Sequence, residues 1–193
     1  MAGILKVDTL QRVGSDSDQI TLSAGSVDLI NPIIKSSDGT TGLTIDGTGR
    51  ILTPARPAFH VATTLTQDVS DSGHGGPTTT VRWNTEIFDI GNNFDIHSGT
   101  SKFTAPVAGI YFFNCTALQA GNGAQMTISL RKNGSSSGRF LSRTDGDGGE
   151  HHSCSVSGLY NLAVNDTVEV YLEGGRIYGD SGYFTNFIGY LIG

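Results

Sequence analysis

Apolar and polar residues alternate in several short runs over the C-terminal two thirds of the chain. Every second residue is apolar in two of these runs, at Met126, Ile128, Leu130, Val168, Val170 and Leu172. A period of two is typical of a strand with one face in a core. Turns rich in Gly, Asn and Ser separate the runs, and no stretch has helical spacing. The pattern predicts an all-β sandwich or jelly roll over residues 55–193.

Two runs, 110–113 and 187–192, are apolar at consecutive positions, so both faces of each strand are apolar. A sandwich strand in a monomer should show one face to solvent. A strand that is apolar on both faces needs a second cover, and the simplest cover is another copy of the chain. The pattern therefore predicts a homo-oligomer; the alternative is a central strand capped by loops. The residues expected in the core and the subunit interface are Phe103, Tyr111, Phe112, Phe113, Phe187, Ile188, Tyr190 and Ile192.

The first 54 residues have a different pattern. They contain no aromatic residue, no Cys and no His, and short apolar bursts such as 20–22 and 43–45 alternate with turn-rich spacers. Such a segment cannot bury a core alone, whereas copies wound around a shared axis can. We predict a short intertwined β fibrous segment over 1–54 and a head domain over 55–193, divided at Thr53–Pro57, where two prolines interrupt pairing. The alternative for 1–54 is a partly disordered tail.

Composition and charge narrow the functions. Hydrophobic residues are 37% and charged residues 16% of the chain, and 27 glycines favour turns and strands over helices. The net charge is −6 without a cluster of Lys and Arg, which argues against a nucleic-acid partner. No apolar stretch is long enough for membrane insertion, and the N-terminal run is too short for a signal peptide, so we expect synthesis in a cytosol without export. Cys115 and Cys154 are expected to be buried thiols, with a mutual disulfide as the alternative.

One stretch carries residues with the chemistry of a site: Asp145, Asp147, Glu150, His151 and His152. Its spacing is not that of a calcium loop, and adjacent histidines on a strand face opposite ways. We expect a solvated loop, with a recognition surface or a metal site as alternatives. The sequence shows no nucleophile elbow and no phosphate loop, so neither an enzyme nor a cofactor or metal is expected.

The head resembles the C1q-like family, which is closely related to the tumour-necrosis-factor jelly roll. The strongest segment is GTSKFTAPVAGIYFF at 99–113, and Asn165 departs from the usual Gly of the family. Six segments in family order carry the resemblance: 56–59, 83–84, 99–113, 132–134, 162–168 and 187–192. The resemblance implies a jelly-roll head that trimerises around a threefold axis.

The N-terminal segment is similar to bacteriophage fibre proteins at 1–11 and 38–46. This resemblance implies that Ile4, Leu5, Val7 and Leu10 anchor the trimer to a virion.

These resemblances imply a non-enzymatic phage structural protein, a homotrimeric tail fibre or tail-tip protein that presents its head for host-surface attachment. Its partners would be itself, other virion proteins, and a host cell-surface receptor or glycan. Its location would be the virion, assembled in the host cytoplasm. Two alternatives stay open: a capsid decoration trimer that stabilises the shell, and a secreted ligand-binding C1q-like module.

Overall fold

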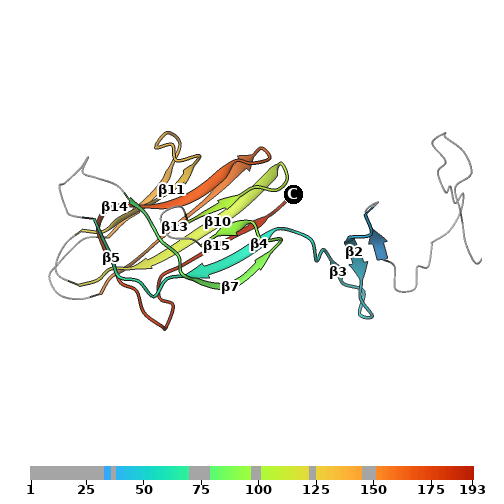
Figure 1. Cartoon of the computed structure of the whole chain (residues 1–193), viewed down its shortest axis with the longest axis horizontal. Coiled ribbons are helices and arrows are strands. Elements are labelled where there is room, and N and C mark those ends of the chain that lie inside the picture. Colours follow the sequence, from blue (N-terminus) through green and yellow to red (C-terminus); the bar gives the residue numbers. More distant parts are fainter. Residues whose placement is uncertain (1–32, 36–37, 70–78, 97–100, 122–124, 145–150) are drawn as a thin grey trace, which may run out of the picture.

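The computed structural model describes residues 33–35, 38–69, 79–96, 101–121, 125–144 and 151–193. All regular structure in these residues is β-strand, and they contain no helix (Figure 1). The predicted all-β class is therefore confirmed. The strands form a small N-terminal sheet and two larger sheets in the head.

The small sheet has the antiparallel order β1-β2-β3, with β1 at Ile33–Lys35, β2 at Thr41–Ile45 and β3 at Ile51–Leu52. Asp46 organises the turn between β2 and β3, because its carboxylate accepts hydrogen bonds from the backbone N–H groups of Thr48 at 2.9 Å and Arg50 at 3.0 Å. These bonds, led by the one from Arg50, lower the pKa of Asp46 to about 2. Ile34, Ile51 and Leu52 are exposed in the single chain, so this sheet buries little apolar surface by itself.

The head is a sandwich of two antiparallel sheets. One has five strands in the order β13-β10-β15-β4-β7. Their bounds are Ser153–Leu162, Gly109–Leu118, Asn186–Leu191, Ala58–Ala62 and Thr85–Ile90. The first strand of the head, β4, pairs with the last, β15, inside this sheet (Figure 1).

The opposite sheet has the order β12-β11-β14-β9-β8, and β5 and β6 also pair with β14. Its edge strand β12 and the strands β11, β14 and β9 span Phe140–Arg143, Thr127–Lys132, Thr167–Ile177 and Lys102–Thr104. The short strands β8, β5 and β6 span Phe94–Asp95, Gln67–Val69 and Thr79–Thr80.

An aromatic cluster fills the space between the sheets. Phe59 lies at its centre, with ring centroids 4.6 Å from Phe94, 5.0 Å from Phe187 and 5.3 Å from Phe103. These separations are those of favourable tilted and offset aromatic pairs. The six alternating residues predicted to face the core are all fully buried: Met126, Ile128, Leu130, Val168, Val170 and Leu172. The period-two prediction is therefore confirmed for β11 and β14.

Two turns that are distant in sequence are joined by a polar clamp. The Asn133 side chain donates a hydrogen bond to Asp166 at 2.8 Å, and its side-chain oxygen accepts one from the backbone N–H of Thr167 at 2.7 Å. Lys132 lies 2.6 Å from the other oxygen of Asp166. Asn133 and Asn165 both have positive φ, which asparagine tolerates better than most residues. The clamp fixes the β11–β12 turn against the turn that begins β14.

Candidate functional site

The outer face of the five-stranded sheet is the candidate site. Strand β10 shows why, because its side chains alternate between two environments. Tyr111 and Phe113 are fully buried in the core, whereas Ile110 on the opposite face is 45% exposed. Phe112 is half-buried on that outer face and contacts Tyr190 of β15 with ring centroids 5.5 Å apart. The predicted doubly apolar run therefore has one face in the core and one on the surface.

Large apolar side chains continue across this face. Leu159 of β13 pairs with Phe112 and is 54% exposed, and Phe88 of β7 is 46% exposed. A hollow of about 530 Å³ lies next to Phe88, over β4, β7 and β15. Its lining residues are Ala58, Phe59, His60, Phe88, Asn186, Ile188, Gly189 and Tyr190.

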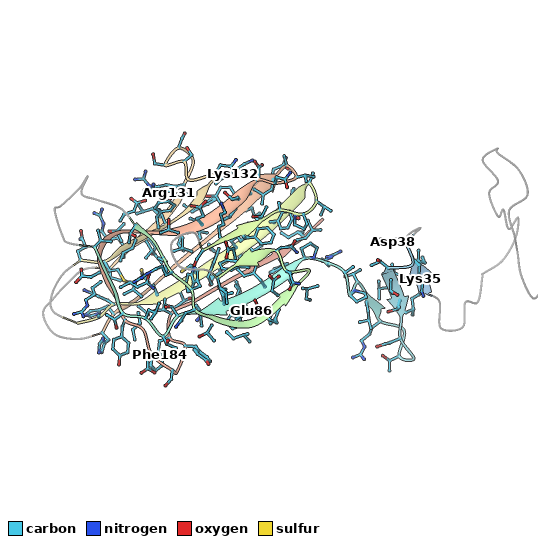
Figure 2. The ribbon with its side chains drawn as sticks, in the orientation of Figure 1. Lys35, Asp38, Glu86, Arg131, Lys132 and Phe184 are labelled. Carbon is cyan, nitrogen blue, oxygen red and sulfur yellow. The ribbon has the colours of Figure 1, made fainter. Side chains whose placement is uncertain are left out.

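Charge is almost absent from the same sheet. The only formally charged residues in its five strands are Glu86 and Asp89, both on the edge strand β7, and β10, β13 and β15 have none. The opposite sheet carries charged residues on β9, β11, β12 and β14. Arg131 and Lys132 accordingly project on one side of the head and Glu86 on the other (Figure 2). An apolar surface depleted of charge has the composition of the centre of a protein interface.

The structure divides the residues expected in the core and the interface into two sets. Phe103, Tyr111, Phe113 and Phe187 are at most 1% exposed within one chain, so their role is core packing. The residues available to a second copy are Phe112, Ile188, Tyr190 and Ile192, which are half-buried or exposed.

Sequence reasoning missed several residues of this face. Ile90, Phe88 and Leu159 belong to it, and so does His60, whose ring lies 6.1 Å from Phe88 in an edge-on arrangement. Partial burial lowers the pKa of His60 from its usual 6.5. A lone histidine in a short apolar strand gives no period-two signal, so sequence alone could not place it here.

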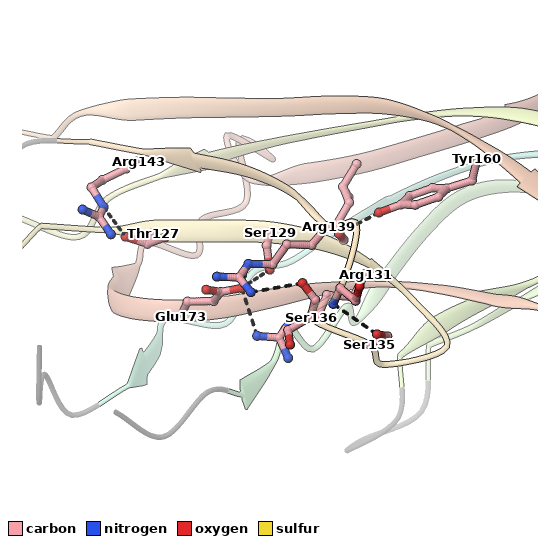
Figure 3. Close-up of polar contacts among 11 residues, drawn as sticks. Thr127, Ser129, Arg131, Ser135, Ser136, Arg139, Arg143, Tyr160 and Glu173 are labelled. Carbon is pink, nitrogen blue, oxygen red and sulfur yellow. Dashed lines mark hydrogen bonds and ion pairs between the residues drawn. The ribbon is translucent and has the colours of Figure 1, made fainter. Parts of the chain in front are cut away.

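The outer face of the opposite sheet has a polar network instead (Figure 3). One oxygen of Glu173 accepts hydrogen bonds from the Ser129 hydroxyl and from Arg131 at 2.9 Å, and it lies 3.2 Å from Arg139. Burial alone would raise the pKa of Glu173, but the hydrogen bonds from Ser129 and Arg131 outweigh it and lower that pKa. The Arg131 guanidinium also covers the Tyr171 ring at 4.1 Å. The network rigidifies this face of the sandwich.

The predicted recognition stretch is only partly described. Asp145, Asp147 and Glu150 lie outside the described residues. The His151 ring hydrogen-bonds the Gln119 carbonyl at 2.7 Å and packs on Tyr178 with centroids 4.8 Å apart, while His152 is half-buried. Within the described ranges, no three His, Cys, Asp or Glu side chains gather to hold a metal ion. A recognition role for this stretch stays a prediction.

The cysteines lie on the core face of neighbouring strands. Cys115 pairs with Val156 and Cys154 with Ala117, so the two thiols are diagonal rather than opposite, and both are free and buried. Burial raises the pKa of Cys154 to about 11 and raises that of Cys115 well above its usual value. They are small core residues and not nucleophiles.

The C1q domain model matches residues 58–192. Complement C1q tumor necrosis factor-related protein 3 of mouse and of human are each 30% identical over 104 residues, which is 54% of this chain and 41% of each relative. The chain thus spans less than half the length of these relatives. Murine APRIL has the same fold with a TM-score of 0.51 and 15% identity, over 71% of this chain and 99% of that one.

These relatives overturn the phage interpretation. These two relatives are mammalian C1q-related proteins and not virion components, so both the tail-fibre function and the virion location are wrong. The virion anchor at Ile4, Leu5, Val7 and Leu10 was inferred only from that resemblance and lies outside the described residues. Among the residues that the structure describes, no helix is long and apolar enough to cross a membrane. The match over residues 58–192, together with the jelly-roll topology, shows that the chain belongs to the C1q domain family.

Proposed function

We propose that the chain is a non-catalytic, ligand-binding C1q-type module that works as a homotrimer. The observation that carries this proposal is the apolar, nearly uncharged outer face of the five-stranded sheet. Ile110, Phe112, Leu159, Phe88 and Tyr190 would gain hydrophobic free energy if a second copy covered them.

The family supports both parts of the proposal. Trimers are typical of C1q and tumour-necrosis-factor folds, and these domains are typically ligand-binding modules without enzymatic activity. A threefold ring needs two different patches on each copy, because its contacts are head to tail. The hollow at His60 and the projecting edge at Leu159 on β13 are two such patches on one face.

The trimer would leave other surfaces free for ligand. The polar face around Arg131 and the loops at the His151 end of the head do not belong to the proposed interface. Three identical copies of each surface would bind a multivalent ligand with avidity.

The small N-terminal sheet fits the same assembly. Ile34, Ile51 and Leu52 are exposed in the single chain. We propose that residues 1–54 form an appendage in which the apolar residues of three chains pack together. This keeps the predicted domain boundary and the intertwined segment, without a virion role.

A charge placed on the interface tests the proposal. We expect Phe112→Asp and Ile188→Asp to sediment as folded monomers at pH 7.5, because assembly would bury a carboxylate on an apolar face. Leu141→Asp is the matched control, since Leu141 is 43% exposed on the edge strand of the opposite sheet and should leave the trimer intact.

Circular dichroism would check that each variant keeps its β structure. Avidity gives a second readout, because the monomeric variants should lose binding to any multivalent ligand that the wild-type chain binds. Folded Phe112→Asp and Ile188→Asp chains that remain trimeric would contradict the proposed interface.

A further inference from the structure

We infer that the assembled head is acid-labile, because protonation of His60 opposes the packing of a second copy on the hollow that His60 lines. This inference rests on the trimer proposed above and adds a means of regulating it. A ligand held by avidity would be released when the three heads separate.

The position of His60 is central to the face. It lies in the middle of β4, between Phe88 of β7 and Ile188 of β15, and it lines the hollow with Tyr190. An aromatic ring on one side and an aliphatic chain on the other give its imidazole few polar partners. Covering the hollow would therefore remove water from the imidazole without replacing it.

Few charged groups face His60 that could neutralise the positive charge of a protonated ring. On β7, Asp89 pairs with Phe59, and one of its oxygens accepts the backbone N–H of Phe94 at 2.8 Å. Glu86 is exposed and lies opposite Val61, beyond the β-bulge. On β15 the ionisable side chain is Tyr190.

A second copy would add no counter-charge if it covered the hollow with its edge strand β13 and the adjacent β10. Those two strands contain no charged residue. An imidazolium in the assembled head would lie in a hollow whose other polar lining residues are Asn186 and Tyr190, with no carboxylate among the lining residues. Burying that cation is costly, so assembly requires the neutral ring.

The direction of the pH effect follows from proton linkage. Partial burial already lowers the pKa of His60 below 6.5 in the single chain, and assembly would lower it further. Separated chains then bind more protons than the trimer, so assembly weakens as the pH falls below about 6.5. The three copies each lose this proton on assembly, so the weakening at low pH multiplies across the trimer, by a factor of about ten for each pKa unit of difference per copy.

Within the described residues, several other ionisable groups can be separated from this effect. The pKa of both Asp46 and Asp166 is about 2, so these carboxylates stay ionised between pH 7.5 and 5. His151 and His152 precede β13 at the other end of β10 from Ile110, where His151 packs on Tyr178. His151 therefore serves as a control histidine.

Sedimentation equilibrium of the full chain between pH 7.5 and 5.0 tests the inference. We expect the wild-type trimer to dissociate over this range, with an association constant that falls by at least a hundredfold. His60→Gln should remain trimeric at pH 5.0, because glutamine is polar but cannot be protonated. His151→Gln should dissociate like wild type.

Each result is decisive. A wild-type trimer with an unchanged association constant at pH 5.0 would overturn the inference and leave the proposed trimer standing, as would a His60→Gln trimer that dissociates like wild type. A wild-type monomer at pH 7.5 would overturn the trimer and the inference with it. If His60→Gln fails to assemble at pH 7.5, His60→Met restores the apolar contact without a titrating group and should form an acid-resistant trimer.

Discussion

At the scale of single residues, neighbouring side chains of β10 lie on opposite faces of the sheet and have different roles. Tyr111 and Phe113 complete the core, and Phe112 between them lies on the outer face. The sequence predicts the doubly apolar strand, but not which side chain faces which way, because a one-residue change of register exchanges the two faces. Packing against Phe59 and Phe103 from other strands decides it.

Gly189 allows two aromatic rings of the core to pack closely against the backbone of β15. A Cβ atom at this position would lie 2.5 Å from Phe113 and 2.6 Å from Phe59. We expect Gly189→Ala to lower the free energy of unfolding by about 1–3 kcal/mol, because two fully buried rings must move.

Gly174→Ala is the control for this substitution, since its nearest atom would be 3.9 Å away in ordinary contact. Urea unfolding at one fixed protein concentration measures both variants. Equal stability of Gly189→Ala and wild type would show that the aromatic cluster is looser than described.

Asp166 gives the clamp a dependence on pH. Hydrogen bonds from Asn133, then Lys132 and the Ala163 backbone, lower the pKa of Asp166 from 3.8 to about 2. The folded state therefore binds fewer protons than the unfolded state between these values. The stabilisation is complete above about pH 4 and is lost as the pH falls to 2.

We expect Asp166→Asn to be less stable than wild type at pH 7 and to lose less stability between pH 4 and pH 2. Thermal unfolding at several pH values measures both effects. If the stability of Asp166→Asn and of wild type changed in parallel with pH, the clamp would be excluded as a source of acid sensitivity.

At the scale of elements, the buried ion pair joins β11 to β14. Glu173 and Arg131 have side chains that are about one tenth exposed, and Arg139 adds a third charge. We expect Glu173→Leu to cost about 3 kcal/mol, because it leaves the Arg131 guanidinium buried without its partner.

Adding Arg131→Met to Glu173→Leu should recover part of this loss, because no buried charge then remains unpaired. A double-mutant cycle on the free energy of unfolding gives the coupling, which we expect to exceed about 1 kcal/mol. Strictly additive effects would show that water screens the pair.

The strands themselves could be predicted to a large extent. The alternation in 126–130 and 168–172 correctly gave the buried faces of β11 and β14. The clamp could not be predicted from spacing alone, because Asn133 and Asp166 are 33 residues apart and meet only after β11 and β14 pair. Burial of Thr127 and Ser129 on the outer face also depends on side chains from neighbouring strands, Arg143 and Glu173.

At the scale of the whole molecule, the motifs of the head specify a packed core, whereas the N-terminal segments do not. The head motifs specify a core, since Phe103, Tyr111, Phe113 and Phe187 all pack between the sheets, and that family assignment is confirmed. The N-terminal resemblance rested on two short segments, 1–11 and 38–46, and was shorter and less specific than that of the head. It specified no core, and the virion role inferred from it was wrong.

Trimer formation through the outer face of the five-stranded sheet is the central claim, and the mass of the full chain in solution tests it most directly. Sedimentation equilibrium at pH 7.5 should give three times the chain mass of 20.3 kDa over a wide range of concentration. A mass of 20.3 kDa at high concentration would contradict the claim, because Phe112, Leu159 and Phe88 would then be stable in contact with water.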